Sequence, residues 1–425
     1  MKTWRCHNGL LPILTMLGLA MPISVLADVP LETLKTQVEQ LQMQLKAIQA
    51  KLEEQEQQSA TKDDVYQLEK EVVQASEWLS PNTIVHLAGY GDVGYSKSYG
   101  DDDNGDFRVG TFAPIFHFQY RDLVMLEAEL EIDVEDNGET NTELEYMTID
   151  VFMNDYAAFV AGKFLSPIGQ FRQNLHPSWI NKMASAPPGF GHDGAAPVSD
   201  VGFQLRGGLP AFGGIRSSYA IFASNGPTLE SEDGELEGID AEGFNEDADG
   251  DKVFGGRVAI LPVPSLEIGL SGATGKAAVN SDDGESIDIK LEGERDYDVY
   301  GADFSYQLMS SNVDWLQGLG LRGEYVKTKV GSTDKGEAAS AGASWETWYT
   351  QAAYRIPSTK IEAVVRYTDF DSAVDSGDQK QWGWGLNYLF SSNVIAKLNY
   401  ELNEGKEKDS ATDSNRFLFQ LAYGF

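Results

Sequence analysis

Four carboxylates alternate with apolar residues along one short segment of the chain. Glu127, Glu129, Glu131 and Asp133 are each followed by an apolar residue within the segment 124–134. Successive side chains of a β-strand point to opposite faces, so the four acids share a wet face and the apolar residues share the other. One side of this strand suits lipid and the other suits water. An exposed sheet edge could also carry these acids, but a soluble sandwich would not need four of them on one strand face.

Basic residues occupy the polar positions of other alternating segments. If the apolar faces meet lipid, the opposite faces point into a lumen, where acids and bases would line an aqueous channel with a transverse field. Any wet lumen is polar, however, and its opposite charges can also simply neutralise one another. The predicted inward bases are Arg108, Lys163, Arg206, Arg216, Arg257, Arg322, Arg355, Arg366, Lys397 and Arg416, and further inward acids are Glu267, Asp303, Glu324 and Glu362.

The sequence offers little for catalysis. Beyond the N-terminal segment the histidines are His86, His117, His176 and His192, and no nucleophile elbow of the form G-x-S-x-G is present. We therefore expect no enzyme, although a His–Ser pairing across a barrel stays open as an alternative.

A metal site is also not expected. The spacing of Asp247, Asp249 and Asp251 begins like an EF-hand, but Lys252 stands where glycine is needed and Val258 where the bidentate glutamate is needed. We expect no cofactor. The acidic segment 225–251 is predicted to be a solvated outer loop that loosely holds divalent cations or bridges them to lipopolysaccharide.

The N-terminus predicts secretion. Lys2 and Arg5 precede an apolar run over 10–26, which two prolines make a poor membrane helix, so residues 1–27 are predicted to be a signal peptide. Cys6 lies inside it, which leaves the mature chain without disulfides or thiolate metal sites. The net charge of −34 excludes nucleic acid as a partner, because phosphate contacts need clustered Lys and Arg.

A helical stalk is predicted over residues 28–80. Apolar residues recur at heptad spacing between Leu31 and Leu52, and again between Val65 and Leu79. The seam is narrow, which favours an oligomerising coiled coil over a lone amphipathic helix, and its residues do not decide between dimer and trimer. Pro81 ends the stalk.

The remaining chain, 81–425, predicts an all-β transmembrane antiparallel barrel of about sixteen strands. Short and long connections alternate almost throughout, as in outer-membrane barrels with short periplasmic turns and long outer loops, which places both termini and the stalk in the periplasm. The segment 415–425 alternates and ends on Phe425, which predicts a lipid-facing closing strand. The strands start near Thr83, Asp106, Asp122, Thr142, Tyr156, Asp200, Gly213, Lys252, Ser265, Asp296, Asp314, Ser344, Lys360, Gln379, Ser392 and Asn415.

The fifth connection, 166–199, is rich in proline and carries aromatic residues that a solvated loop would not need. Its stretch 162–169, continued through Leu175-His176-Pro177, resembles phosphate- and carbohydrate-type porins. A coiled coil followed by a sixteen-stranded barrel resembles porins implicated in siderophore uptake. The resemblance implies that this third outer loop folds inward and narrows the pore, but it carries over no ligand-binding residues. The predicted constriction residues are Phe171, Arg172, Trp179, Phe190, His192 and Asp193.

These features predict a porin of the Gram-negative outer membrane that lets small polar solutes or ions diffuse passively. Its expected partners are outer-membrane lipid, lipopolysaccharide, two further copies in a homotrimer and, through the stalk, peptidoglycan. The alternative is a ligand-selective uptake channel for a siderophore, phosphate or sugar, without a TonB-type plug. Arginine rows suit anions, and Trp179 or Phe190 could form a stacking surface. Acidic mouths favour cations and inward arginines oppose them, so at most mild ion selectivity is expected.

Overall fold

The structure, a computed structural model, describes residues 83–99, 105–192, 194–232, 235–245, 247, 250–279, 294–308, 317–333, 341–408 and 410–425. It also describes four helical pairs between residues 35 and 47. The chain divides into two compact units, Met1–Ser80 and Pro81–Phe425. The signal peptide and most of the predicted stalk lie outside the described residues, so both stay predictions. Within the described part, no helix is long and apolar enough to cross a membrane.

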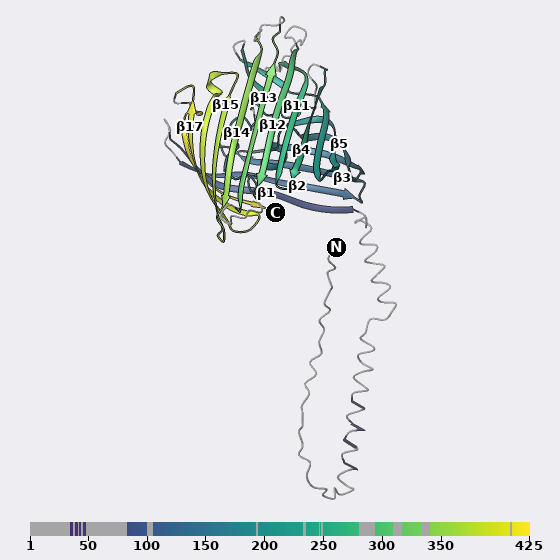
Figure 1. Ribbon diagram of the computed structural model, residues 1–425. Helices are drawn as coiled ribbons and strands as arrows, with labels where there is room; N and C mark the ends of the chain where they lie inside the picture. Colours follow the sequence, from purple (N-terminus) through teal and green to yellow (C-terminus); the bar gives the residue numbers. More distant parts are fainter. Residues whose placement is uncertain are drawn as a thin grey trace. The chain divides into compact units, whose positions relative to one another are not determined.

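Sixteen antiparallel strands close into a barrel, which confirms the predicted fold (Figure 1). Each strand pairs with its neighbour in the chain, except that β7 pairs with β10 across an inserted hairpin. The barrel strands are β1 (Thr83–Tyr99), β2 (Gly105–Tyr120), β3 (Val124–Val134), β4 (Thr140–Asn154), β5 (Ala157–Leu165), β6 (Ser199–Phe212), β7 (Ile215–Ser224), β10 (Val253–Val263), β11 (Leu266–Val279), β12 (Arg295–Gln307), β13 (Leu319–Val330), β14 (Ala343–Arg355), β15 (Ile361–Asp371), β16 (Gln379–Leu389), β17 (Val394–Gly405) and β18 (Asn415–Gly424).

The last strand closes the ring. β18 pairs with β1 from Tyr90↔Gly424 to Tyr99↔Asn415. The backbone N–H of Phe425 donates to the Gly89 carbonyl at 2.9 Å, and that of Gly89 donates to the Phe425 carbonyl at 3.0 Å. The alternation of the terminal segment therefore belongs to a closing strand, because a barrel without edges leaves no ladder groups unpaired in lipid.

Strand starts fall close to the predicted positions, with one clear exception. The eleventh barrel strand was expected near Asp314, but β13 begins at Leu319. Gly318 has a φ of 91°, a left-handed conformation that a regular strand does not adopt. The strand therefore starts only after this glycine.

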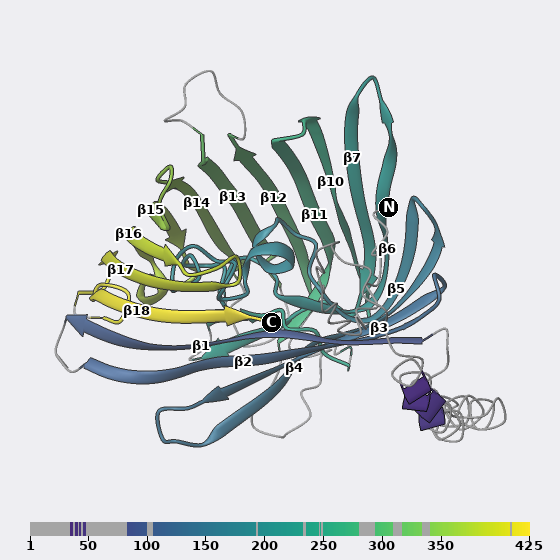
Figure 2. The same cartoon turned by 90° about the horizontal axis from the view of Figure 1, so that it is seen from below.

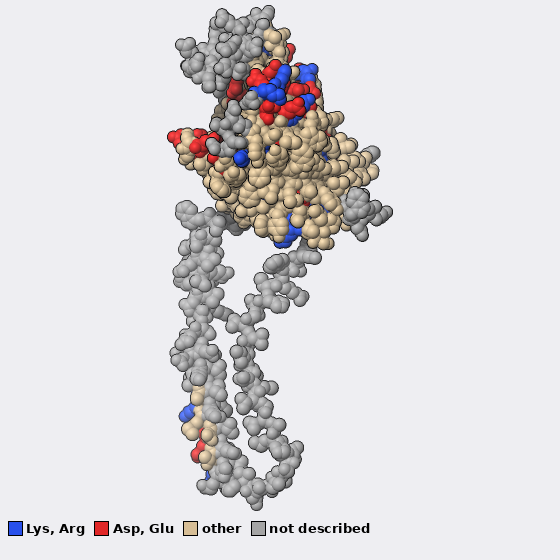
Figure 3. Space-filling model, turned by 90° about the vertical axis from the view of Figure 1, so that its left-hand side faces the viewer, with Lys and Arg blue, Asp and Glu red and all other residues tan. Residues whose placement is uncertain are grey.

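The outer face of the barrel is apolar. Side chains such as Phe254, Leu270 and Trp384 alternate with inward residues and are exposed, with Leu270 66% accessible. On the face drawn in Figure 3, a broad uncharged area covers the barrel, and most of the charged side chains gather beyond one edge of it. This arrangement suits a hydrocarbon layer bordered by polar headgroups.

Two segments fill part of the barrel interior. The first is the connection 166–198, which lies inside the ring of strands in Figure 2 and contains one π-helical turn, Phe171–Leu175. The second is a hairpin of β8 (Thr228–Glu232) and β9 (Glu235–Asp240) between β7 and β10, which adds two parallel pairings to β11.

The hairpin corrects the prediction of a solvated loop over 225–251. Leu229, Leu236 and Ile239 are only 0%, 4% and 3% accessible and pack in one core with residues of the 166–198 connection and of the wall. The many acids of this segment hid three apolar side chains whose burial removes them from water. In the EF-hand-like stretch the Lys252 ammonium pairs with the Asp247 carboxylate, and Asp249 lies outside the described residues.

Candidate functional site

The inward loop (residues 166–198) is held by an apolar core on one side of the barrel. Phe190 is fully buried, and its ring lies 5.9 Å from that of Phe171 and 5.2 Å from that of Tyr349 on β14. Ile168 joins the same core. The aromatic side chains of the loop thus pack on the inner wall, which opposes movement of the loop out of the lumen.

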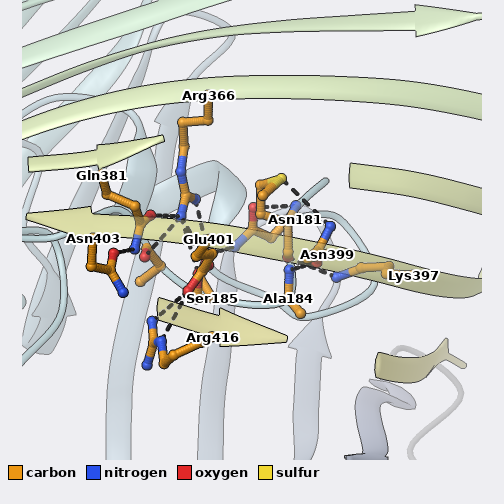
Figure 4. Close-up of polar contacts among 12 residues, drawn as sticks. Asn181, Ala184, Ser185, Arg366, Gln381, Lys397, Asn399, Glu401, Asn403 and Arg416 are labelled. Carbon is orange, nitrogen blue, oxygen red and sulfur yellow. Dashed lines mark hydrogen bonds and ion pairs between the residues drawn. The ribbon is translucent and has the colours of Figure 1, made fainter. Parts of the chain in front are cut away.

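Polar contacts fix the next part of the loop against β15–β18 (Figure 4). The Arg366 guanidinium donates to the Ser185 carbonyl at 2.9 Å and to the Ala186 carbonyl at 3.2 Å. The Lys397 ammonium donates to the Met183 carbonyl at 3.0 Å and also to the Ser178 carbonyl and to Gln420. These cations replace the hydrogen bonds that the loop carbonyls would otherwise make with water.

Acids of the wall hold the first turn of the loop. The Gln170 amide donates to Asp303 at 2.8 Å, and the backbone N–H of Phe171 donates to Glu324 at 3.1 Å. Asp303 also accepts from Arg257 at 2.6 and 2.9 Å. Several inner charges are therefore structural: they attach the loop to the barrel instead of facing an open pore.

The predicted inward bases fall into three groups. Arg257, Arg366 and Lys397 are buried in contacts with acids or loop carbonyls. Arg206 pairs with Asp150 at 2.5 Å, and Arg416 pairs with Glu401 at 2.7 Å. By strand alternation, the inner rows also carry Arg108, Arg216, Arg322 and Arg355.

Lys163 is the exception among the predicted bases. It falls on the row of β5 that contains the exposed Phe159, whereas Val160 and Phe164, which are buried against the interior, occupy the other row. The prediction that Lys163 points inward is therefore wrong by strand position. The segment 157–165 has apolar residues on both rows, so its alternation could not reveal which side faces lipid.

Open space remains on the opposite side of the lumen, along β1–β3. A cavity of about 340 Å³ is bordered by Asp92, Glu131, Arg172, His176 and His192. A second cavity of about 720 Å³ adjoins it and shares Asp92, Gly110, Ala184 and Gln420 as lining residues. The inward loop thus borders this open space on one side and the strands that carry the acids border it on the other.

The predicted acid row stands on the inner face of β3. The Tyr90 hydroxyl donates to Glu129 at 2.9 Å, the Tyr146 hydroxyl donates to Glu127 at 2.8 Å, and the Thr111 hydroxyl donates to Asp133 at 2.7 Å. From Glu127 to Asp133 the row extends about 20 Å at the rise of an antiparallel strand. Within the described chain, the ion pairs of these carboxylates involve only His117 and His176.

Two β-bulges bring further groups to the constriction. On β4 the register with β3 shifts so that Glu145 is an extra residue between Leu144 and Tyr146, and both Glu145 and Tyr146 are buried. On β2 a second shift, opposite Asp92, turns Thr111 toward the β3 acids. Bulges re-aim side chains in this way. Because a bulge breaks the period of two, the alternation pattern gave no signal for Glu145.

The other predicted loop residues are placed as follows. Arg172 is buried, with its Nη1 atom 3.9 Å from the Glu145 carboxylate. Trp179 lies against Gly424 of β18, where an added Cβ would come within 2.6 Å of its ring. Asp193 lies outside the described residues.

His192 contacts Glu242, which follows β9. Its Nδ1 atom donates to the Glu242 carboxylate. This hydrogen bond raises the pKa of the His192 imidazole and lowers the pKa of the Glu242 carboxyl. The pair therefore ties the inward loop to the segment that follows the hairpin.

We expect Phe190→Ala to loosen the inward loop. Truncating a fully buried phenylalanine removes transfer free energy and leaves a cavity, which costs about 3–5 kcal/mol. Urea unfolding of the purified barrel, followed by tryptophan fluorescence, measures this loss. Phe159→Ala is the matched control, because its ring is on the exposed outer row and stacks on Phe203. Equal losses for the two variants would show that the loop core is not a stabilising element.

Comparisons with known proteins agree with this architecture. A sequence profile of Gram-negative porins matches residues 80–408. No curated protein sequence matches the chain. Among solved structures, an anion-selective porin from Comamonas acidovorans is similar, with 15% identity, coverage of 81% of this chain and 100% of that chain, and a TM-score of 0.53.

Two further structures have comparable similarity. The outer membrane channel DcaP of Acinetobacter baumannii shares 10% identity over 81% of this chain and 98% of that chain, with a TM-score of 0.53. A loop L8 deletion mutant of OmpT, an outer membrane protein of Vibrio cholerae, shares 13% identity over 81% of this chain and 100% of that chain, with a TM-score of 0.52. At such identities the structures support the fold alone. Together with the profile match and the lipid-facing barrel, they lead to one conclusion: the chain is an outer-membrane channel for passive diffusion and belongs to the Gram-negative porin family.

Proposed function

We propose that this porin forms a homotrimer of channels that admit small polar solutes and prefer cations to anions. The observation that carries the preference is the charge of the residues lining the two adjoining cavities. They include five carboxylates but only two arginines. The carboxylates are Asp92, Asp106, Glu131, Glu135 and Asp136, and the arginines are Arg108 and Arg172. A narrow passage with an excess of one charge concentrates counter-ions.

Among the predicted inward bases, Arg108 lines these two cavities and the others do not. The Arg366 guanidinium and the Lys397 ammonium donate hydrogen bonds to carbonyls of the inward loop, and Arg416 pairs with Glu401. Arg206 and Arg257 do border a separate cavity of about 420 Å³, but each of them is paired with an acid. Arg257, Arg366 and Arg416 thus contact acids or loop carbonyls and do not line the two adjoining cavities, which supports the proposal of an acidic passage.

The same contacts disfavour an anion-selective uptake channel. A row of arginines binds anions when its guanidinium groups are available, and here Arg257, Arg366 and Arg416 donate to acids or loop carbonyls. We also take the chain to be a channel and not an enzyme. Its described histidines contact carboxylates, another histidine or a backbone carbonyl, and these contacts give no nucleophile–base pair.

Three features support assembly and contact with the membrane surface. The predicted heptad seam would favour association of the chains, and the outer face of β14–β18 has a concave apolar groove of about 520 Å³ that a neighbouring barrel could fill.

Outward charged pairs such as Lys327–Glu346 and Lys380–Asp369 lie near the long-loop edge. Their lysines suit the phosphates of lipopolysaccharide. Contact of the stalk with peptidoglycan remains part of the proposal.

Liposomes that contain the purified protein should swell in isotonic solutions of small sugars, at rates that fall smoothly as the sugar becomes larger. Passive diffusion through water predicts no saturation with concentration, whereas a ligand-selective channel would saturate. Light scattering of the detergent-solubilised protein should give the mass of three chains, and a monomer mass would contradict the trimer. A saturable rate for one sugar would instead support the uptake alternative.

A further inference from the structure

We propose that Glu131, Glu145 and His192 bind a divalent metal ion of the Zn²⁺ type at the constriction, and that the bound ion blocks the passage. The three residues come from β3, from the bulge of β4 and from the inward loop. Each offers one ligand atom, and these atoms lie within 4.8 Å of one another. Zinc bonds of about 2.0–2.2 Å need donors roughly 3.3 Å apart, so a shift of an ångström or so would complete the site.

The surroundings of His192 suit a metal ligand. Its Nδ1 atom contacts the Glu242 carboxylate, so in the neutral imidazole Nδ1 carries the proton and Nε2 has the free lone pair. Metal-bound histidines commonly have this arrangement, in which a carboxylate on the far nitrogen fixes the tautomer and strengthens the ligand.

Glu145 provides an independent observation. Its side chain is only 4% accessible, and its Oε1 atom makes no hydrogen bond within the described structure. The nearest cation is the Arg172 guanidinium, whose Nη1 atom is 3.9 Å away, beyond hydrogen-bond distance. A buried carboxylate oxygen without a hydrogen bond is costly, and a metal ion would satisfy it.

The positive charge of Arg172 disfavours the binding of a metal ion at this place, but the nearby carboxylates outnumber it. Glu145, Glu131 and Glu242 all interact electrostatically with the one Arg172 guanidinium. The mixed set of two carboxylates and one imidazole suits Zn²⁺, Ni²⁺ or Cu²⁺, whereas Mg²⁺ and Ca²⁺ prefer oxygen ligands alone. Glu131 and His192 line the 340 Å³ cavity, so an ion held between them would occupy the passage.

Two measurements on the full-length purified protein test the proposal. Isothermal titration with ZnCl₂ should show one site per chain, and His192→Ala and Glu145→Gln should each weaken Zn²⁺ binding about tenfold or more. Single-channel recording in a planar bilayer should show a Zn²⁺-dependent fall in current that Mg²⁺ at the same concentration does not cause. In both variants, the Zn²⁺ concentration for half-block should rise by the same factor as the dissociation constant.

His86 and His117 supply the control, because their Nδ1 atoms lie 3.3 Å apart and form another potential zinc-binding pair. The double variant His86→Ala/His117→Ala should keep the affinity of the unmodified chain. Zinc binding that survives both His192→Ala and Glu145→Gln, or that is lost with the His86–His117 pair, overturns the site. Zinc binding without a fall in current overturns the block. Because titration does not depend on conduction, a failure of the site can be told apart from a failure of the proposed ion preference.

Discussion

Replacing Arg366 and Lys397 together by methionine is expected to increase the single-channel conductance about twofold or more, since pore width controls conduction. Methionine keeps most of the length and volume of both side chains but removes the donors. The Ser185, Ala186 and Met183 carbonyls then lose their partners inside the barrel. That segment of the inward loop should leave the wall and open the constriction.

The expected cost in stability is also large. Removing one partner of a buried charged contact costs about 3–5 kcal/mol, and Arg366 and Lys397 are 1% and 0% accessible.

Recordings of the double variant should show larger and noisier currents, and protease should cut the loop in folded barrels. The control is Lys327→Met/Lys380→Met, which removes two lysines from outward pairs. A double variant with unchanged conductance and an uncut loop would show that these cations do not hold it.

Neutralising the acids of the passage is expected to reduce the preference for cations. The triple variant Asp92→Asn/Asp106→Asn/Glu131→Gln removes three of the five lining carboxylates and leaves both arginines. The amide oxygens keep the acceptor roles toward Gln420 and Thr111. Because the excess of negative charge disappears, the K⁺/Cl⁻ permeability ratio should fall about threefold or more, toward or below one.

A matched variant separates lumen charge from total charge. Glu346→Gln/Asp369→Asn/Asp371→Asn removes the same charge from outward rows of β14 and β15, which carry the exposed Trp348 and the half-buried Tyr367. The permeability ratio of this control should change little, because outward charges are screened from the passage. Equal changes in the two triple variants would mean that selectivity follows the charge of the whole mouth and not the lining at the constriction.

The strands of the barrel could be predicted from the sequence because their side chains alternate with a period of two. The β3 acids and the terminal segment each alternate strictly, and the strand that each predicts is present. The alternation of short and long connections gave independent support for the number of strands. The aromatic residues Phe171 and Phe190 indicated that the 166–198 connection is not a freely solvated loop. Its inward course was implied by the resemblance to sixteen-stranded porins.

The partners of the charged side chains could not be predicted. Alternation places Arg366 and Lys397 on inner rows but cannot tell an open lumen from one filled by a distant loop. Glu145 escaped prediction because its bulge adds one residue to a strand. The β8–β9 hairpin escaped prediction because Leu229, Leu236 and Ile239 are too few to form a periodic pattern among acids, and their burial depends on the core formed with the inward loop.

The most direct test is the zero-current potential of the unmodified channel in a planar bilayer across a tenfold KCl gradient. An acidic passage beside the inward loop predicts that the dilute side becomes positive, because K⁺ crosses more readily than Cl⁻. The potential should shrink when the ionic strength is raised on both sides, since salt screens the carboxylates. A potential of zero, or a negative dilute side, would contradict the proposal that the acids of this constriction govern passage.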